Sequence, residues 1–419
     1  MEKITFTNGL TVAMDYKPEA HSAAVNICVA AGNRFENETD SGISHFIEHM
    51  VFKGTLTRSS DAIARESDLM GGQLNAYTAK EYTCFYSRAL TEHVGRTLRL
   101  LCDMLCNPLF NKHDIETEKC VVLEELGMYE DSPEDFCTDT LTALCFKGKP
   151  MGFNILGTRE SVQSFTADDL RRYMAKTYVP ERIVVSLCGN FDSKEVLEIL
   201  DAYFGGHKNT GNPLKYDNFG INGGIELRPR ESEQTQIAFC FNGLPMDHPL
   251  RYAASFYSSI AGGASSSRIN RRIREELGLA YSAYSFVSGY LGTGVFGVSA
   301  GLAPKNQERF FCEVADILKT TRDSITDEEI ELTREQFKAG MVLSNESMSS
   351  AASAAGRQLL LEGCYTDLEG ILRKINAVTL DEVREAAALI TDPKTVALAV
   401  VGETHTLEFY ENMLEQLNV

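Results

Sequence analysis

The segment SGISHFIEHMVFKGT, residues 41–55, places two histidines and a glutamate in one short apolar stretch. If the segment is helical, His45 and His49 are four residues apart and their rings project from the same face. Glu48 follows His45 by three residues and shares that face. Two imidazoles at this spacing can bind one zinc ion and leave an open coordination position. The pattern therefore predicts a hydrolytic zinc site, with the histidines as ligands and Glu48 as the proton-transferring base.

The same segment has an ordinary structural explanation. Asp40 or Ser41 can cap a helix that ends near Phe52, since Gly54 follows. Two hydrogen-bonded histidines and one surface acid on such a helix would need no metal. However, the chain has only eight histidines, so composition alone produces an H-x-x-E-H match in roughly one such chain in a hundred. The order H-x-x-E-H is also the inverzincin signature, the reverse of H-E-x-x-H.

A catalytic zinc ion usually takes three protein ligands, so one more is needed. The best source is the amphipathic stretch 114–135, DIETEKCVVLEELGMYEDSPED. Glu118 and Glu125 are seven residues apart and share a helix face, whereas Glu124 points about 100° away. Spacing alone leaves both Glu125 and Glu124 open as the third ligand.

The chain also contains an internal repeat. Residues 165–190 align without a gap on the segment that begins 213 positions later, which pairs Thr166 with Thr379 and Gly189 with Gly402. Each copy predicts a helix capped by its threonine, a turn through proline, and a β-branched strand that ends at the glycine. This repeat indicates a duplicated α+β domain.

The length agrees with a duplication, because 419 residues suit two domains of about 200. Each half opens on an apolar strand, AAVNICVAAG and TQIAFCFNGL, that leads into a helix. A stretch rich in Gly, Asn and Lys lies between the halves. We therefore expect a domain at 1–208, a linker at 209–222 and a homologous domain at 223–419.

The composition indicates which binding partners and which cellular compartment to expect. The net charge of −19 argues against nucleic acid, which binds a basic face. No apolar run approaches the roughly 20 residues of a membrane span, and the first residues lack a targeting pattern. Eleven cysteines without a C-x-x-C pair are typical of reduced thiols in a cytosolic chain. We expect a cytoplasmic protein with no nucleic-acid and no membrane partner.

Four segments together resemble the pitrilysin/insulin-degrading-enzyme superfamily. They are HFIEHMVFKGT, GGQLNAYTAKEYTCFYSRAL, VVLEELGMYEDSPED and REELGLAYS, and they follow the order of the family motifs. The similarity covers essentially the whole chain and is greatest to the short-chain branch, which includes mitochondrial processing peptidase and bacterial relatives. It implies two α+β domains of the processing-peptidase/LuxS-like fold, each with a mostly antiparallel sheet covered by helices. Metal is then expected in the first domain alone, because the second has no H-x-x-E-H segment.

The resemblance assigns roles to the acids that spacing left open. It implies one zinc ion per chain, held by His45, His49 and Glu125. It makes Glu118 a nearby assisting carboxylate and leaves Glu124 as the fallback ligand.

The resemblance also implies where a peptide binds. The matching segment is an edge strand, Asn75, Ala76 and Tyr77, to which the substrate adds in extended form. Such binding depends on main-chain hydrogen bonds more than on side-chain contacts. Gly262 and Gly263 resemble a shortened glycine-rich loop of the non-catalytic processing-peptidase subunit. Residues alternate in pattern before and after Lys80, so 71–90 is predicted to form a hairpin. The structural alternative for the strand is that this hairpin is an ordinary part of the core.

The resemblance also implies a dimeric assembly, through the pair Arg274 and Tyr281. Arg274 and Tyr281 match an arginine–tyrosine pair that helps bind substrate and stabilise the oxyanion, although without the resemblance we would favour a surface arginine and a half-buried strand aromatic. Long-chain relatives place this pair and the zinc in different domains of a four-domain clamshell. Because this chain supplies two domains, we expect a homodimer in which the pair of one chain completes the site of the other in trans.

The expected function is therefore that of a zinc-dependent endopeptidase. It would hydrolyse short or unfolded peptides inside a closed dimeric chamber, with Glu48 as the general base toward a zinc-bound water. The alternative is a catalytically silent scaffold, the core subunit of a hetero-oligomeric relative. Every expected ligand is present, which favours the enzyme. The peptide preference, and a heterodimer with a related chain, stay open.

Overall fold

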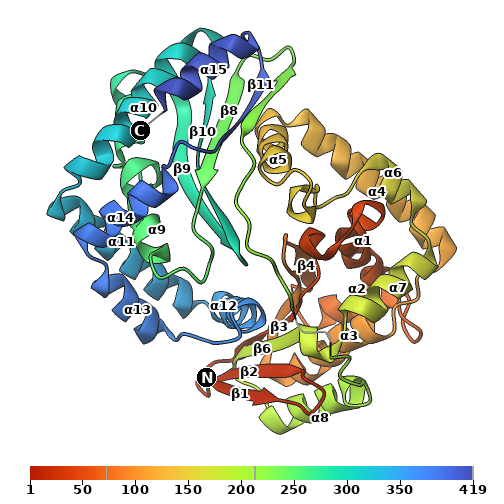
Figure 1. Cartoon of the computed structure of the whole chain (residues 1–419). Coiled ribbons are helices and arrows are strands. Elements are labelled where there is room, and N and C mark those ends of the chain that lie inside the picture. Colours follow the sequence, from red (N-terminus) through yellow and green to blue (C-terminus); the bar gives the residue numbers. More distant parts are fainter. Residues whose placement is uncertain (72, 212–213, 418–419) are drawn as a thin grey trace. The chain divides into compact units, whose positions relative to one another are not determined.

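The computed structural model describes residues 1–71, 73–211 and 214–417 (Figure 1). The chain forms two compact units, and each is assembled from three segments of the sequence. The first unit comprises Met1–Leu126, Phe153–Lys215 and Val342–Asp367. The second comprises Gly127–Gly152, Tyr216–Met341 and Leu368–Val419. Residues 212 and 213 of the predicted linker, and 418 and 419 at the end of the predicted second domain, lie outside the described residues.

The first unit is built on a six-stranded sheet of order β1-β2-β6-β3-β5-β4. Its strands are β1 (Glu2–Thr5), β2 (Thr11–Tyr16), β3 (Ser22–Val29), β4 (Asn75–Thr78), β5 (Thr83–Leu90) and β6 (Ile183–Gly189). Only β2 and β6 pair in parallel, and the other neighbours are antiparallel. β4 forms one edge of this sheet and pairs with β5, as the predicted hairpin requires.

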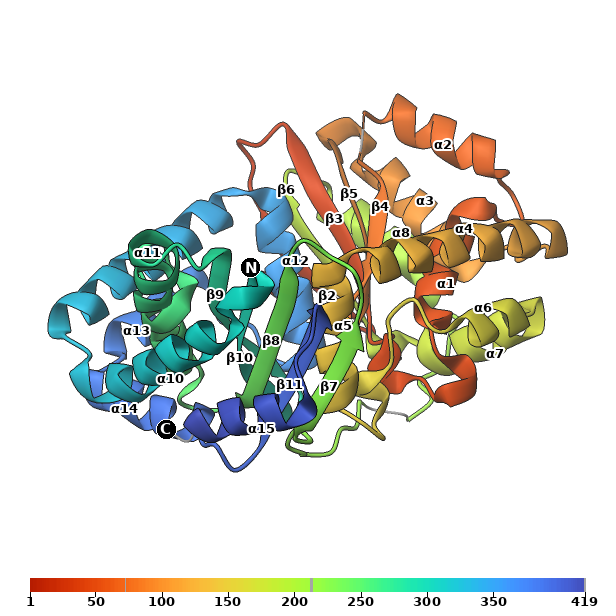
Figure 2. The same cartoon turned by 90° about the horizontal axis from the view of Figure 1, so that it is seen from above.

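Helices cover both faces of this first sheet. They are α1 (Ile43–Met50), α2 (Ser60–Leu69), α3 (Val94–Cys106), α4 (Lys112–Asp131), α6 (Arg159–Ser164), α7 (Ala167–Thr177), α8 (Ser193–Phe204) and α12 (Met348–Leu361). Side chains alternate along β3, so Val25 and Ile27 join the main core that contains α3. Ala24 instead packs with Ala352 of α12, and α12 lies against β3 and β6 (Figure 2).

The second unit is built on a five-stranded sheet of order β7-β11-β8-β10-β9. Its strands are β7 (Gly224–Pro229), β8 (Thr235–Asn242), β9 (Ala280–Tyr290), β10 (Thr293–Leu302) and β11 (Val396–Gly402). Its helices are α5 (Pro133–Cys145), α9 (Arg251–Ser258), α10 (Gln307–Ser324), α11 (Asp327–Glu346), α13 (Leu368–Ala377), α14 (Leu380–Ile390) and α15 (Leu407–Gln416). α5 packs on β8 and β11, although it comes from the first half of the sequence.

The two sheets repeat one topology, which confirms the predicted α+β fold and its duplication. β2-β6-β3-β5-β4 and β7-β11-β8-β10-β9 show the same succession of one parallel pair followed by antiparallel pairs. Thr166 and Thr379 cap α7 and α14, each within a capping box. The strands that follow end at Gly189 (φ 131°) and Gly402 (φ 125°), in a region that glycine adopts without strain.

Across the described part of the chain, no helix combines the length and the apolar character that crossing a membrane requires.

Candidate metal centre

The helix α1 carries the H-x-x-E-H segment and is fixed at its N-terminus by Glu36. The Glu36 carboxylate accepts hydrogen bonds from the backbone N–H groups of Gly42 (2.8 Å) and Ser44 (3.0 Å). Gly42 is the N-cap residue, with φ of 87°, so the prediction that Asp40 or Ser41 caps this helix was wrong. Burial raises the pKa of Glu36 to about 7, and the hydrogen bonds from Ser44 and Gly42 oppose that rise. A carboxylate at this position also interacts favourably with the helix dipole.

Three side chains from α1 and α4 meet at one point. His45, His49 and Glu125 each offer a ligand atom, and these atoms all lie within 4.8 Å of one another. The Nε2 atoms of both histidines are 3.7 Å from Oε2 of Glu125. In a tetrahedral zinc site with bonds of about 2.1 Å, neighbouring ligand atoms are about 3.4 Å apart. The three donors therefore suit one zinc ion, whereas the exposed Glu124 is not in this group.

The environment of His45 keeps its imidazole neutral. Burial, and then the neighbouring His49, lower the pKa of His45 to about 3. The neutral ring is the form that ligates a metal. Its Nδ1 atom is buried and lacks a hydrogen-bond partner among the described residues.

His49 is oriented by a carboxylate that a lysine holds in turn. Its Nδ1 lies 2.8 Å from Oε1 of Glu118, and Oε2 of Glu118 lies 2.5 Å from Nζ of Lys53. Burial would raise the pKa of Glu118, but the hydrogen bonds to His49 and Lys53 bring it below its usual value. An ionised Glu118 accepts a hydrogen bond from the Nδ1–H group of His49, which leaves the Nε2 lone pair of His49 facing Glu125. Histidines that ligate metals are commonly fixed in this way.

Glu48 is held by a threonine of the edge strand. The Thr78 hydroxyl donates to Oε2 of Glu48 at 2.6 Å. The Thr83 hydroxyl lies 3.3 Å from that of Thr78 and donates its own proton to the Ala31 carbonyl at 3.1 Å. A hydroxyl group donates one hydrogen bond. Thr83 donates its hydrogen bond to Ala31, so the hydroxyl of Thr78 donates to Glu48. Burial raises the pKa of Glu48, and the hydrogen bond from Thr78 opposes that rise.

The predicted substrate strand is β4. Ala76 is buried, while Asn75 is exposed and Tyr77 is 36% exposed. The Tyr77 hydroxyl lies 3.1 Å from that of Tyr82 across the hairpin. The strand therefore combines an edge position with a direct link, through Thr78, to Glu48.

The predicted oxyanion residues belong to the second unit. Arg274 lies on the helical turn Asn270–Glu276, and Tyr281 lies on β9. The guanidinium carbon of Arg274 is 5.1 Å from the centroid of the Tyr281 ring, a cation–π contact. Tyr281 is 79% exposed, so its hydroxyl is accessible.

The predicted glycine-rich loop differs from expectation. Gly262 and Gly263 end a π-helical turn, Ser259–Gly263, that continues α9. A Cβ atom on Gly262 would lie 2.6 Å from the backbone nitrogen of Ser285 on β9. Gly262 therefore serves a close helix–strand contact, and Gly263 is the exposed member of the pair.

Three residues at the metal centre were not predicted: Glu36, Lys53 and Thr78. Lys53 and Thr78 lie inside the motifs described above, yet their partners come from other elements, which spacing does not show. No signal in the sequence pointed to Glu36, because Asp40 and Ser41 were suitable caps and the glycine N-cap is seen only in the structure.

Two family profiles match the chain. Residues 11–159 match the insulinase profile, peptidase family M16, and residues 164–337 match the peptidase M16 inactive domain. The uncharacterized zinc protease YmxG of Bacillus subtilis (strain 168) is 36% identical over 400 residues, covering 95% of this chain and 98% of that protein. An uncharacterized zinc protease of Rickettsia bellii is 32% identical over 407 residues, covering 96% and 97%.

Solved structures share the fold. The peptidase M16 inactive domain from Pseudomonas fluorescens superposes with a TM-score of 0.89 at 18% identity, covering 97% of this chain and 98% of that one. A protease from Helicobacter pylori gives 0.86 at 20% identity, covering 96% and 99%. A chain of complex III2 from Candida albicans gives 0.85 at 18% identity, covering 99% of each.

Proposed function

Because the chain belongs to peptidase family M16, the insulinase family, we propose that it is a zinc-dependent endopeptidase that hydrolyses short or unfolded peptides. One observation carries the proposal: His45 and His49 of α1 and Glu125 of α4 offer ligand atoms within 4.8 Å of one another, and α1 also carries Glu48. The names of its relatives, which are called zinc proteases, support it.

Each residue of the metal centre has a role in peptide hydrolysis. His45, His49 and Glu125 would hold the zinc ion. When bound there, the ion polarises the scissile carbonyl and makes water acidic enough to react near neutral pH. Glu48 takes the proton of the attacking water and later delivers it to the leaving amine. Since Thr78 occupies Oε2, we assign the proton transfer to Oε1 of Glu48.

The other predicted residues would bind the peptide. An extended substrate would pair with the main chain of β4 along Asn75, Ala76 and Tyr77. Arg274 and Tyr281 would donate hydrogen bonds to the oxyanion as the carbonyl is attacked. Their mutual contact supports their acting as a pair.

The function is tested by metal analysis with a peptide-cleavage assay. The purified chain should contain one zinc ion and cleave members of a peptide library, and a chelator should abolish cleavage until zinc is restored. A chain with neither metal nor chelator-sensitive cleavage would support the scaffold alternative instead.

We also propose that the active chamber is a homodimer whose sites are completed in trans. Mixing a Glu48→Gln chain with a Tyr281→Phe chain should then restore activity, because half of the dimers are mixed and each has one intact site. Recovery should reach about a quarter of the wild-type value after full exchange.

This mixing experiment has a matched control. The double variant Glu48→Gln/Tyr281→Phe, mixed with Glu48→Gln, contains no intact site and should stay inactive. Efficient subunit exchange without recovery in the main mixture would contradict sharing in trans.

Thr78 should position the base without affecting zinc or substrate binding. A hydrogen bond to a charged group contributes about 1.5–3 kcal/mol, so Thr78→Val should reduce kcat by about 10- to 100-fold, with zinc content and KM unchanged. Thr78→Ser retains the hydroxyl and should recover most of the rate. Steady-state kinetics with zinc analysis test this; a Thr78→Val enzyme with the wild-type kcat would refute it.

A further inference from the structure

The first unit contains a cavity of about 690 Å³ that is separate from the metal centre. Its described lining comes from the loop that holds Leu56, from the end of α3 and the following loop, from α7 with the residues that lead into β6, and from the end of α8 and the residues after it. None of these lining residues lies on α1, α4 or β4, the elements that carry the metal centre. The cavity is therefore not part of the metal centre.

The interior of this cavity is apolar. Leu105, Phe110, Met174 and Phe204 are buried and form part of its lining. At its mouth Leu56 is 73% exposed. A concave apolar site of several hundred Å³ with few polar groups is typical of a small-molecule site.

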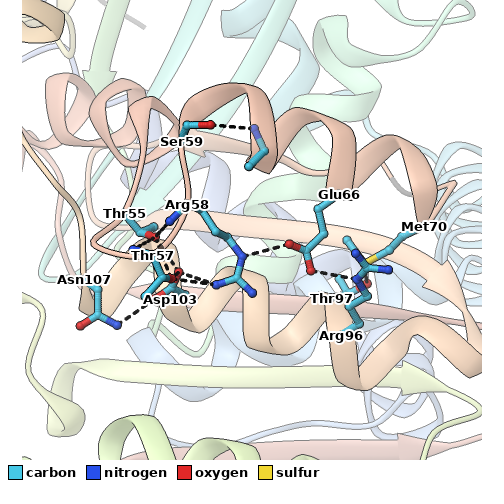
Figure 3. A network of polar contacts seen from close by, with 11 residues as sticks. Thr55, Thr57, Arg58, Ser59, Glu66, Met70, Arg96, Thr97, Asp103 and Asn107 are labelled. Carbon is cyan, nitrogen blue, oxygen red and sulfur yellow. Dashed lines mark hydrogen bonds and ion pairs between the residues drawn. The ribbon is translucent and has the colours of Figure 1, made fainter.

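One wall is fixed by a buried aspartate. Thr55, Arg58 and Asn107 all donate hydrogen bonds to Asp103, at 2.7, 2.7 and 2.9 Å (Figure 3). The backbone N–H of Leu56 donates to the Asn107 carbonyl at 3.0 Å. The loop that presents Leu56 is thus tied to the end of α3, and this wall is formed before any ligand arrives.

The part of the lining that follows α8 is fixed as well. The Asn8 side-chain amide donates to the carbonyls of Phe204 (2.8 Å) and His207 (3.3 Å). The backbone N–H of Thr210 donates to Glu181 at 2.7 Å. These bonds hold the residues after α8 in place beside the cavity.

The charged side chains of the lining are basic. They are Arg171 and Lys208, and no aspartate or glutamate is among the described lining residues. This local excess of positive charge contrasts with the net charge of −19 for the chain. Arg171 donates a hydrogen bond to the Leu109 carbonyl at 3.3 Å and pairs with Asp168 at 3.3 Å. The side chains of Arg171 and Asp168 are 55% and 92% exposed, so this ion pair is weak and Arg171 can also bind another anion.

We propose that this cavity binds a fatty carboxylate. The alkyl chain occupies the apolar interior, and the carboxylate lies at the mouth between Lys208 and Arg171. Each methylene buried contributes a roughly fourfold gain in affinity until the cavity is filled. A nucleotide or sugar fits poorly, because so apolar a lining offers few hydrogen-bond partners for a polar body.

The chain has no tryptophan, so Leu56→Trp introduces a single fluorescent reporter at the mouth. Titrating this variant with decanoate should give a saturable change in emission, unaffected by zinc chelation. The control is Leu69→Trp, an equally exposed position on α2 outside the cavity lining, which should not respond. Adding Lys208→Glu to the reporter chain should weaken decanoate binding at least about tenfold and leave binding of neutral 1-decanol unchanged.

Three results would overturn the proposal. They are the absence of a saturable response to decanoate, an equal response from the Leu69 control, and decanoate affinity that is indifferent to Lys208→Glu. Lys208 is an exposed side chain, so its substitution leaves the fold intact, which circular dichroism verifies. Failure here would leave the proposed peptidase function untouched, because cleavage and zinc content are measured separately.

Discussion

Glu48→Gln should bind zinc normally and lose kcat by a factor of about 10²–10⁴, the usual contribution of a general base. Glutamine keeps the size of the side chain and can still accept the hydrogen bond from Thr78, but it cannot take a proton. Glu48 is not in the group of ligand atoms, so metal content should stay at that of the wild type. Steady-state kinetics and elemental analysis on one preparation measure both.

The matched control for this variant is Glu124→Gln. Glu124 is an exposed glutamate of α4 outside the ligand group, so its substitution should alter neither zinc content nor rate. A Glu48→Gln enzyme with the wild-type rate would remove Glu48 from the mechanism. Loss of zinc from Glu48→Gln would mean that this carboxylate binds the metal.

His45→Ala should remove the metal and, with it, the activity. Loss of a partner that only orients a ligand typically costs 10- to 100-fold in metal affinity, so loss of a ligand itself should cost more than about 100-fold. α1 should still form, because Glu36 and not His45 fixes its N-terminus. Zinc should therefore raise the Tm of the wild type and leave that of His45→Ala unchanged.

Two further variants test which carboxylates near the histidines bind the zinc ion and which only orient a ligand. Glu118→Gln keeps the ligands but weakens the orientation of His49, so it should show an intermediate affinity. Glu124→Ala should bind zinc as the wild type does. If Glu124→Ala lost zinc and Glu125→Ala retained it, the third ligand would be misassigned.

The sequence predicted best what depends on local chemistry. Thr166 and Thr379 cap helices because a threonine hydroxyl followed three residues later by an acid satisfies the first helical N–H groups. The alternating residues before and after Lys80 predicted the β4–β5 hairpin for the same local reason. The resemblance to the insulinase family, stated from four short motifs, is confirmed by the family matches along the chain.

Tertiary contacts escaped prediction. Asp40 and Ser41 had suitable side chains for capping α1, but Glu36 reaches that position from an irregular segment and excludes them. The glycine pair after α9 was expected to form a loop, but Gly262 belongs to a helical turn in close contact with β9. Spacing could not show that Thr78 bonds to Glu48, because the bond joins two different elements.

The exchange of helices between the halves was not visible in the sequence either. α5 packs on the second sheet and α12 on the first, each contributed by the opposite half of the chain. A helix with one apolar face has the same spacing of apolar residues in its sequence whichever sheet it covers. The repeat indicated that the sheets are alike, but it held no information about which helix covers which sheet.

The central claim is that His45, His49 and Glu125 bind one catalytic zinc ion. Anomalous diffraction at the zinc absorption edge, from crystals of the zinc-loaded wild-type chain, tests it most directly. The account predicts one strong peak in each chain, within about 2.0–2.2 Å of Nε2 of both histidines and of a Glu125 carboxylate oxygen. A peak bound by other residues, or no peak in a preparation that cleaves peptides, would contradict it.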